Sequence, residues 1–322
     1  MGAINEFFKE KAEINNIKSI AKLKNIKNDY FLRKLFLHLQ DRKILDIVKY
    51  NKNIQKRLNL DINAYKEYSE IFSSIEIEIK PVKDGYGKFI NIPSKDRVYY
   101  YIYFNNNKYE INKRNDNYID ENEEIKIIKI IIDYHITSLE KLFYFCRCIE
   151  SINFKKFYRN NITNMSYMFG FCQSLKELNL NNFNTNNVTD MHGMFSGCSL
   201  LTKLNLNNFN TNNVTDMHNM FSGCFSLTEL NLNNFNTNNV TDIHGMFSYC
   251  NSLEKLNLNN FNTNNVTDMS EMFNNCRALK ELNLNNFNTN NITNINNMFE
   301  GCSKELRMKI KTQYKNIKDE AF

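Results

Sequence analysis

The sequence contains no tryptophan and has only two prolines and nine glycines among its 322 residues. It also lacks a Gly-rich phosphate loop, an H-E-x-x-H pair, a G-x-S-x-G elbow and a paired-cysteine zinc motif. The longest apolar run, residues 125–132, is short and contains two lysines, so it does not predict a membrane-spanning helix. We therefore expect no enzyme, no catalytic residues, no cofactor and no transmembrane segment.

Asparagine is the residue that the chain has in abundance, with 59 copies. Most of them belong to a sequence, LNLNNFNTNNVTDMxxMFxxC, that recurs at a constant spacing of 26 residues. Aligned at this spacing, the repeats extend from residue 136 to residue 302. A fixed period of this length predicts a stacked repeat architecture.

Seven of the eight cysteines occupy one position of this repeat, which predicts small buried side chains with free thiols. Charge is less regular, because residues 1–60 carry 14 Lys and Arg against six Asp and Glu. These charges alternate with apolar residues, so they predict solvated helix faces and no nucleic-acid partner. The start of the chain has no secretory signal, which favours a cytoplasmic protein unless an export segment precedes it.

Four regions are expected along the chain. Residues 1–70 have apolar residues at helical spacing and predict a helical unit. Residues 71–135 predict a β-rich unit that leads into the array, with strands at 74–80, 87–92, 98–104, 108–113 and 125–134. Residues 136–302 are the repeats. Residues 303–322 have one apolar face and predict a C-terminal capping helix.

Each repeat is expected to combine a short strand with a short helix. The first half alternates leucine with polar residues, as in Leu175, Leu178 and Leu180, and predicts a strand. The second half begins with Thr189 or Asp190 as a helix cap. It places apolar residues at i, i+3, i+4 and i+7, which are Met191, Met194, Phe195 and Cys198.

The repeats resemble the BspA-like leucine-rich repeats, whose copies read roughly LxxLxLxxFxTxxVxxMxxMFxxC. The matching residues of one copy are Leu204, Leu206, Phe209, Thr211, Val214, Met217, Met220, Phe221 and Cys224. The resemblance implies an α/β solenoid with a parallel concave sheet and short helices, and it implies ligand binding on that sheet. Residues 28–60 more loosely resemble an F-box, a helical module that recruits an adaptor protein.

The candidate binding face consists of the outward residues around the strand leucines. Opposite charges and stacked amides along this face predict that it is nearly neutral and satisfies its own hydrogen bonds. Its residues are Glu177, Asn179, Asn181, Lys203, Asn205, Asn207, Glu229, Asn231, Asn233, Lys255, Asn257, Asn259, Glu281, Asn283 and Asn285.

Two further sets of residues recur at the same spacing. Specificity is expected at the positions that vary between copies, which are Ser199, Phe225, Asn251 and Arg277. A column of imidazoles could in principle hold a metal, but each lies one residue after a core position. We therefore expect an exposed column without a metal at His192, His218 and His244.

The sequence thus predicts a non-enzymatic scaffold for protein–protein interaction, with an intracellular adaptor as the first interpretation. Two alternatives stay open. The resemblance implies a surface or adhesion protein that binds host or cell-surface components, and near-identical repeats are also compatible with a purely structural solenoid. The partner is expected to be a protein, and the sequence indicates neither its identity nor the oligomeric state.

Overall fold

The computed structural model describes residues 52–58, 73–105, 117–315 and 317–322, and the chain divides into two units at residues 72 and 73. In the first unit the described element is the helix α5 (Lys52–Leu58). The remainder of the predicted helical unit, most of the F-box-like segment 28–60 and the predicted strand 108–113 lie outside the described residues.

The second unit begins with a five-stranded sheet in the order β3-β5-β1-β6-β7. Its strands are β1 (Ile75–Pro81), β3 (Tyr100–Phe104), β5 (Ile128–Ile132), β6 (Ile149–Lys156) and β7 (Glu177–Asn179). In β1, isoleucines at alternate positions are fully buried while the glutamates between them are partly exposed. Beside the sheet, the 3-10 helix η2 (Ser94–Tyr99) precedes β3, and β2 (Gly87–Lys88) pairs with β4 (Tyr118–Ile119).

Strand β6 joins this sheet to the repeats. One edge of β6 pairs antiparallel with β1, and the other edge pairs parallel with β7, with Ile152 opposite Leu178. These two residues are 26 positions apart, so β6 occupies the strand position of the first repeat. The antiparallel strands therefore cover the edge that the first repeat would otherwise expose.

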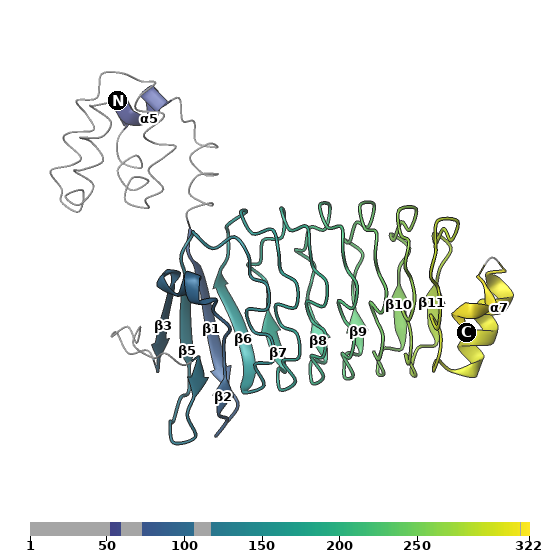
Figure 1. The fold of residues 1–322 in the computed structure, drawn as a ribbon, viewed down its shortest axis with the longest axis horizontal. Helices are drawn as coiled ribbons and strands as arrows, with labels where there is room; N and C mark the ends of the chain where they lie inside the picture. Colours follow the sequence, from purple (N-terminus) through teal and green to yellow (C-terminus); the bar gives the residue numbers. More distant parts are fainter. Residues whose placement is uncertain (1–51, 59–72, 106–116, 316) are drawn as a thin grey trace. The chain divides into compact units, whose positions relative to one another are not determined.

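The remainder of the unit is a repeat domain of 26-residue coils with short parallel strands (Figure 1). Strand β8 (Lys203–Leu204) pairs with β9 (Glu229–Leu230), and β10 (Lys255–Asn257) pairs with β11 (Glu281–Asn283). Each pairing joins residues 26 positions apart. A second ladder of parallel bridges runs along another side of the coils, from Ser138 to Asn294, again with one step per coil.

The predicted short helices of the repeats are absent from the described coils of the array, so that expectation was wrong. The segments form consecutive turns, in which the N–H of Met194 donates to the carbonyl of Met191 and that of Ser196 to Gly193. The N–H groups between them donate to the next coil, as from Phe195 to the Met220 carbonyl (2.9 Å). A helix would have used these donors within its own segment.

The backbone dihedrals explain why a helix cannot continue here. Gly193 and Gly197 have φ values of +57° and +71°. Asn219, which is equivalent to Gly193 in the following coil, has a φ of +54°. Two left-handed residues per coil interrupt right-handed helical geometry. The spacing i, i+3, i+4, i+7 still identified core residues correctly, because these turns bury the same side chains.

Phenylalanine and cysteine form two continuous columns inside the stack. The buried rings from Phe143 to Phe299 follow one another with centroid separations of 5.5–5.8 Å. All eight described cysteines are free and buried. The six thiols from Cys172 to Cys302 each donate to the carbonyl of the phenylalanine 29 residues earlier, at 3.0–3.2 Å. Cysteine therefore fills space and also satisfies a backbone acceptor.

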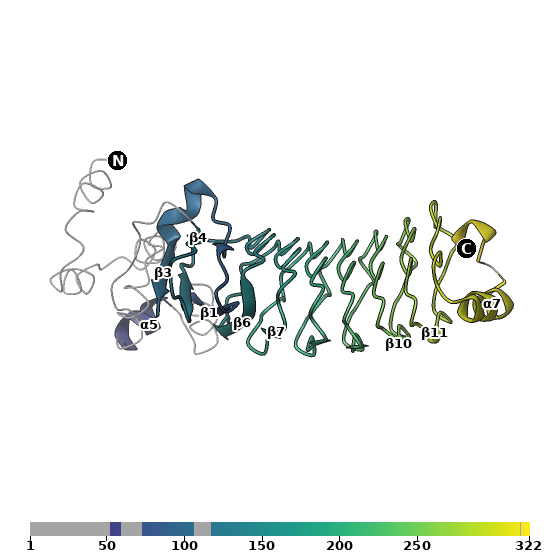
Figure 2. The same cartoon turned by 90° about the horizontal axis from the view of Figure 1, so that it is seen from below.

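The C-terminal segment closes the other end of the stack (Figure 2). Helix α7 (Lys304–Gln313) starts at Ser303, whose side chain accepts from the N–H of Leu306, and it buries Leu306 and Ile310. In η3 (Asp319–Ala321), two carbonyls accept the N–H groups of Asn297 and Phe299 (2.8 and 2.7 Å). The Phe322 ring stacks on Phe299 at 5.3 Å. These groups take the place of a further coil.

Truncating one ring of the phenylalanine column tests the packing. We expect Phe221→Ala to lower the free energy of unfolding by about 3–5 kcal/mol, because this ring is fully buried between two others. Phe225→Ala is the matched control, since that ring is 45% exposed and its loss should cost about 0.5 kcal/mol or less. Urea unfolding followed by circular dichroism measures both, and a loss below about 1 kcal/mol for Phe221→Ala would contradict the packing.

The thiols should differ in reactivity along the array. Burial raises the pKa of Cys224 to about 12, and that of Cys148 and Cys302 to about 11. Since the thiolate is the reactive form, we expect the native chain to react slowly with N-ethylmaleimide and first at Cys148 and Cys302. Peptide mapping by mass spectrometry reads out the order of labelling, and equally fast labelling of Cys224 would disprove it.

Candidate functional site

The structure places the predicted binding face on the strand side of the coils. Fourteen of its fifteen residues are exposed, and Asn283 is partly covered. The Tyr314 hydroxyl lies 3.4 Å from the Asn283 Oδ1 and accepts the N–H of Leu284, so the C-terminal segment covers that last rung. The face is therefore a regular surface that ends at β11.

Most polar groups of this face bond to one another. The side-chain oxygen of Asn205 accepts the N–H of Asn207, and the same bond recurs in the other coils at 2.9–3.1 Å. Amides also join neighbouring coils, as from Asn231 to Asn207 (3.2 Å). Amides beside the face, such as that of Asn208, donate to two carbonyls of the preceding coil. Asparagine therefore holds the coils together, and few of its groups are left for a ligand.

In the charged column of the face, one lysine and one glutamate of adjacent coils form an ion pair. Lys255 and Glu281 approach to 2.8 Å, whereas no ion pair is found at Glu177, Lys203 or Glu229 within the described residues. The column beside it, which was not predicted, pairs Glu150 with Lys176 (3.2 Å) and Glu254 with Lys280 (3.1 Å). Both members of the Lys255–Glu281 and Glu254–Lys280 pairs are largely exposed, so these two pairs contribute little to stability.

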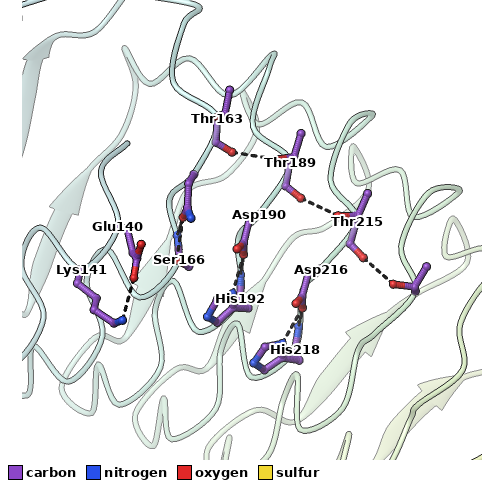
Figure 3. A network of polar contacts seen from close by, with 12 residues as sticks. Glu140, Lys141, Thr163, Ser166, Thr189, Asp190, His192, Thr215, Asp216 and His218 are labelled. Carbon is purple, nitrogen blue, oxygen red and sulfur yellow. Dashed lines mark hydrogen bonds and ion pairs between the residues drawn. The ribbon is translucent and has the colours of Figure 1, made fainter. Parts of the chain in front are cut away.

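A histidine column lies on the turn side of the stack and consists of His192, His218 and His244. Their rings are parallel, with centroid separations of 4.4 and 4.6 Å. The Nδ1 atom of each ring lies 2.6–2.8 Å from the carboxylate two residues earlier, on Asp190, Asp216 and Asp242. Figure 3 shows the first two pairs pointing in the same direction from adjacent coils.

These histidines are less exposed than the sequence indicated, with 21–35% of each side chain accessible. The aspartate holds each ring along the coil, because one carboxylate oxygen accepts both the backbone N–H and the ring N–H of its histidine. The signal for this contact was present in the sequence as a D-x-H spacing repeated at 26 residues. It was missed because the segment was interpreted as a helix.

Each histidine ring faces a different residue of the preceding coil, namely the residue that comes directly after the histidine position there. This difference makes the three rings inequivalent. Tyr167, one coil before His192, packs its ring edge-to-face with that imidazole at 5.0 Å. The equivalent residue for His218 is Gly193, which has no side chain. The equivalent residue for His244 is Asn219, whose amide Nδ2 lies 3.2 Å from the imidazole Nε2. Gly193 thus offers no side chain to the Nε2 of His218, and the Tyr167 ring lies against Gly193 instead.

The contact between His244 and Asp242 shifts the pKa of both groups. The pKa of His244 is raised, chiefly by its hydrogen bond to Asp242, although burial opposes the shift. Burial alone would raise the pKa of Asp242, but hydrogen bonds from the side chain and backbone of His244 outweigh it and the pKa is lowered. The same balance with His218 lowers the pKa of Asp216.

Serine takes the place of histidine in the coil that follows His244. The hydroxyl of Ser270 donates to the Asp268 carboxylate at 2.6 Å. Ser270 shows that serine can replace histidine in this column with the same contact to the preceding carboxylate.

A family model described as "Mycoplasma protein of unknown function, DUF285" matches residues 137–256 and 225–319. Together the two matches span more than half of the 322 residues. The chain belongs to the DUF285 family. The overlap of the two matches is what a model that covers several repeats produces in an array of this kind. Neither curated proteins nor solved structures gave a match.

In this DUF285 chain the variable repeat positions gather along one corner of the coils, next to the buried cysteines. Phe225 and Arg277 are exposed there, and Ser199 and Asn251 are half-buried. Several exposed apolar side chains share this corner, and we call them the apolar corner: Phe145, Leu200, Phe225 and Tyr249. A membrane-spanning helix was not found anywhere in the described part of the chain.

The titration of His244 predicts a pH-dependent stability. A histidine whose folded pKa is raised stabilises the fold below its unfolded pKa, and the contribution is lost as the pH rises through the folded pKa. We expect the Tm advantage of the native chain over His244→Ser to shrink as the pH rises from about 6 to well above the ordinary histidine value of about 6.5.

Differential scanning fluorimetry across this range measures the effect. Serine is the chosen replacement because Ser270 occupies the equivalent position of the next coil. Phe225→Ala, which removes no titrating group, should differ from the native chain by the same amount at every pH. A pH-independent difference for His244→Ser would refute the role of the imidazole.

Proposed function

We propose that this DUF285 chain is a non-enzymatic scaffold that binds another protein through its repeat array. In this proposal the array is a leucine-rich-repeat solenoid of the BspA-like type, in which short strands line one side and tight turns replace helices on the other. The partner contacts the apolar corner, and the repeated asparagines serve chiefly to hold the coils in register.

The exposed apolar residues of the corner are the observation that supports this assignment. Leu200, Phe225 and Tyr249 are 44–46% exposed, whereas most apolar side chains elsewhere in the array are buried. The rings of Phe225 and Tyr249 contact edge-to-face at 6.4 Å, so they present one continuous surface. Exposed apolar residues that cluster on a regular scaffold are typical of protein-binding sites, in which aromatic residues are enriched.

The sheet face is the second candidate for the contact surface. Its exposed asparagines and the Lys255–Glu281 pair are already hydrogen-bonded to neighbouring coils. A partner would therefore have to replace bonds that are already made, and the net gain would be small. The repetition of identical residues along this face also offers no fixed register for a partner.

Two matched double variants of the full chain distinguish these surfaces. We expect Phe225→Ser with Tyr249→Ser to weaken the retention of a specific partner by at least about tenfold, because exposed aromatic anchors dominate such interfaces. Asn231→Ser with Asn257→Ser changes the sheet face and should leave retention unchanged.

Affinity purification from the source cells, followed by quantitative mass spectrometry, identifies proteins retained by the native chain. Surface plasmon resonance with the purified partner then measures the affinities of both double variants. Loss of binding only in the sheet-face variant would refute the apolar corner. The absence of any protein retained above an unrelated repeat protein would refute the scaffold proposal as a whole.

A further inference from the structure

The histidine column brings together groups that metal ions prefer as ligands. His192, Asp216 and His218 each offer one ligand atom, and these atoms lie within 4.8 Å of one another. They come from two adjacent coils, and all three residues are half-buried. Imidazole nitrogens are frequent zinc ligands, and water completes the coordination of open zinc sites.

The aspartates orient the imidazoles in the way that metal-binding histidines require. Each Nδ1 lies against its own carboxylate, at 2.7 Å for His192 and 2.6 Å for His218. This contact favours the tautomer in which Nδ1 carries the proton and Nε2 keeps its lone pair. Carboxylates bonded to the far nitrogen of a histidine ligand fix its orientation and raise its basicity.

The residue after each histidine selects the first pair of rings over the second. The Nε2 of His244 already faces the Asn219 amide at 3.2 Å, so the group formed by His218, Asp242 and His244 has one ligand atom engaged. Gly193 leaves the Nε2 edge of His218 free of such an amide. A side chain is sterically blocked at that position, because a Cβ there would lie 2.3 Å from the Tyr167 ring.

The two rings must turn before they can share one ion. Ligand atoms around a tetrahedral zinc ion lie about 3.3 Å apart, given bond lengths near 2.0–2.1 Å. The two imidazoles are stacked 10° from parallel with their centroids 4.4 Å apart, so their Nε2 atoms must approach by roughly an ångström and their in-plane lone pairs must turn towards each other. Both side chains are about one-fifth exposed and lie outside the buried phenylalanine column, so they can turn without disturbing the core.

We propose that the Nε2 atoms of His192 and His218 bind a divalent transition metal such as Zn²⁺, with water completing the coordination. Asp190 and Asp216 orient the two rings through their Nδ1 atoms. The site lies on the turn side of the array and does not depend on the proposed protein-binding function. Imidazole ligands suit zinc, copper and nickel, whereas calcium and magnesium prefer sites made entirely of oxygen. The sequence alone favoured no metal here, because it did not show that the rings are stacked and oriented by aspartates.

Titration of the full chain with ZnCl₂ in a calorimeter tests the site, in a non-chelating buffer with a phosphine reductant. We expect one zinc per chain, and at least about tenfold weaker binding in both His192→Ser and His218→Ser, since each removes one ligand. Serine keeps the contact to the preceding aspartate, as Ser270 does, so these variants should fold. In His244→Ser the affinity should be unchanged.

His135→Ser is the matched control, because His135 also pairs with an aspartate but stacks between Tyr99 and Tyr134. Zinc should also raise the Tm of the native chain and of His135→Ser, but not that of His218→Ser. Equal affinities for the native chain and His218→Ser would overturn the proposal, and so would an equal loss in His135→Ser. An equal loss in His244→Ser and His192→Ser would overturn the assignment to the first pair.

Discussion

Backbone hydrogen bonds between neighbouring coils, repeated every 26 residues, are the constraint on which this structure depends. They join the strands on one side and the turns on the other, and parallel bridges continue the ladder from Ser138 to Asn294. Each residue is therefore stacked on its equivalent in the next coil. Whatever residue type the repeat has at a position becomes a column of that chemistry along the array.

Such columns are stable only if a side chain can pack favourably against the identical side chain of the neighbouring coil. Asparagine meets this requirement because its amide is both a donor and an acceptor, and it links coils along several columns. Phenylalanine rings stack, and each cysteine thiol finds a carbonyl in the preceding coil. The aspartate column places like charges one coil apart, and hydrogen bonds from histidine or serine offset that repulsion.

The same constraint separates scaffold from function. Positions identical in every coil build the ladder, so both proposed sites depend on the positions where copies differ. The apolar corner arises where Phe225 and Tyr249 depart from the residues at the same positions of other coils. The proposed zinc site arises where histidine occupies consecutive coils and where Gly193, unlike Asn219, has no amide to engage the Nε2 of the next ring. The two ends of the array differ from its middle because each must satisfy donors and acceptors that no further coil supplies.

The sequence by itself determined the period, the parallel strands around residues such as Leu178 and Leu204, and the buried phenylalanine and cysteine columns. A side chain that recurs every 26 residues must stack on itself, whatever the local backbone does. Only the tertiary structure decided that Met191 to Cys198 form turns, because that depends on whether N–H groups bond within their own coil or to the next. It alone also decided the histidine column, since ring stacking is set by the separation of coils that local spacing does not encode.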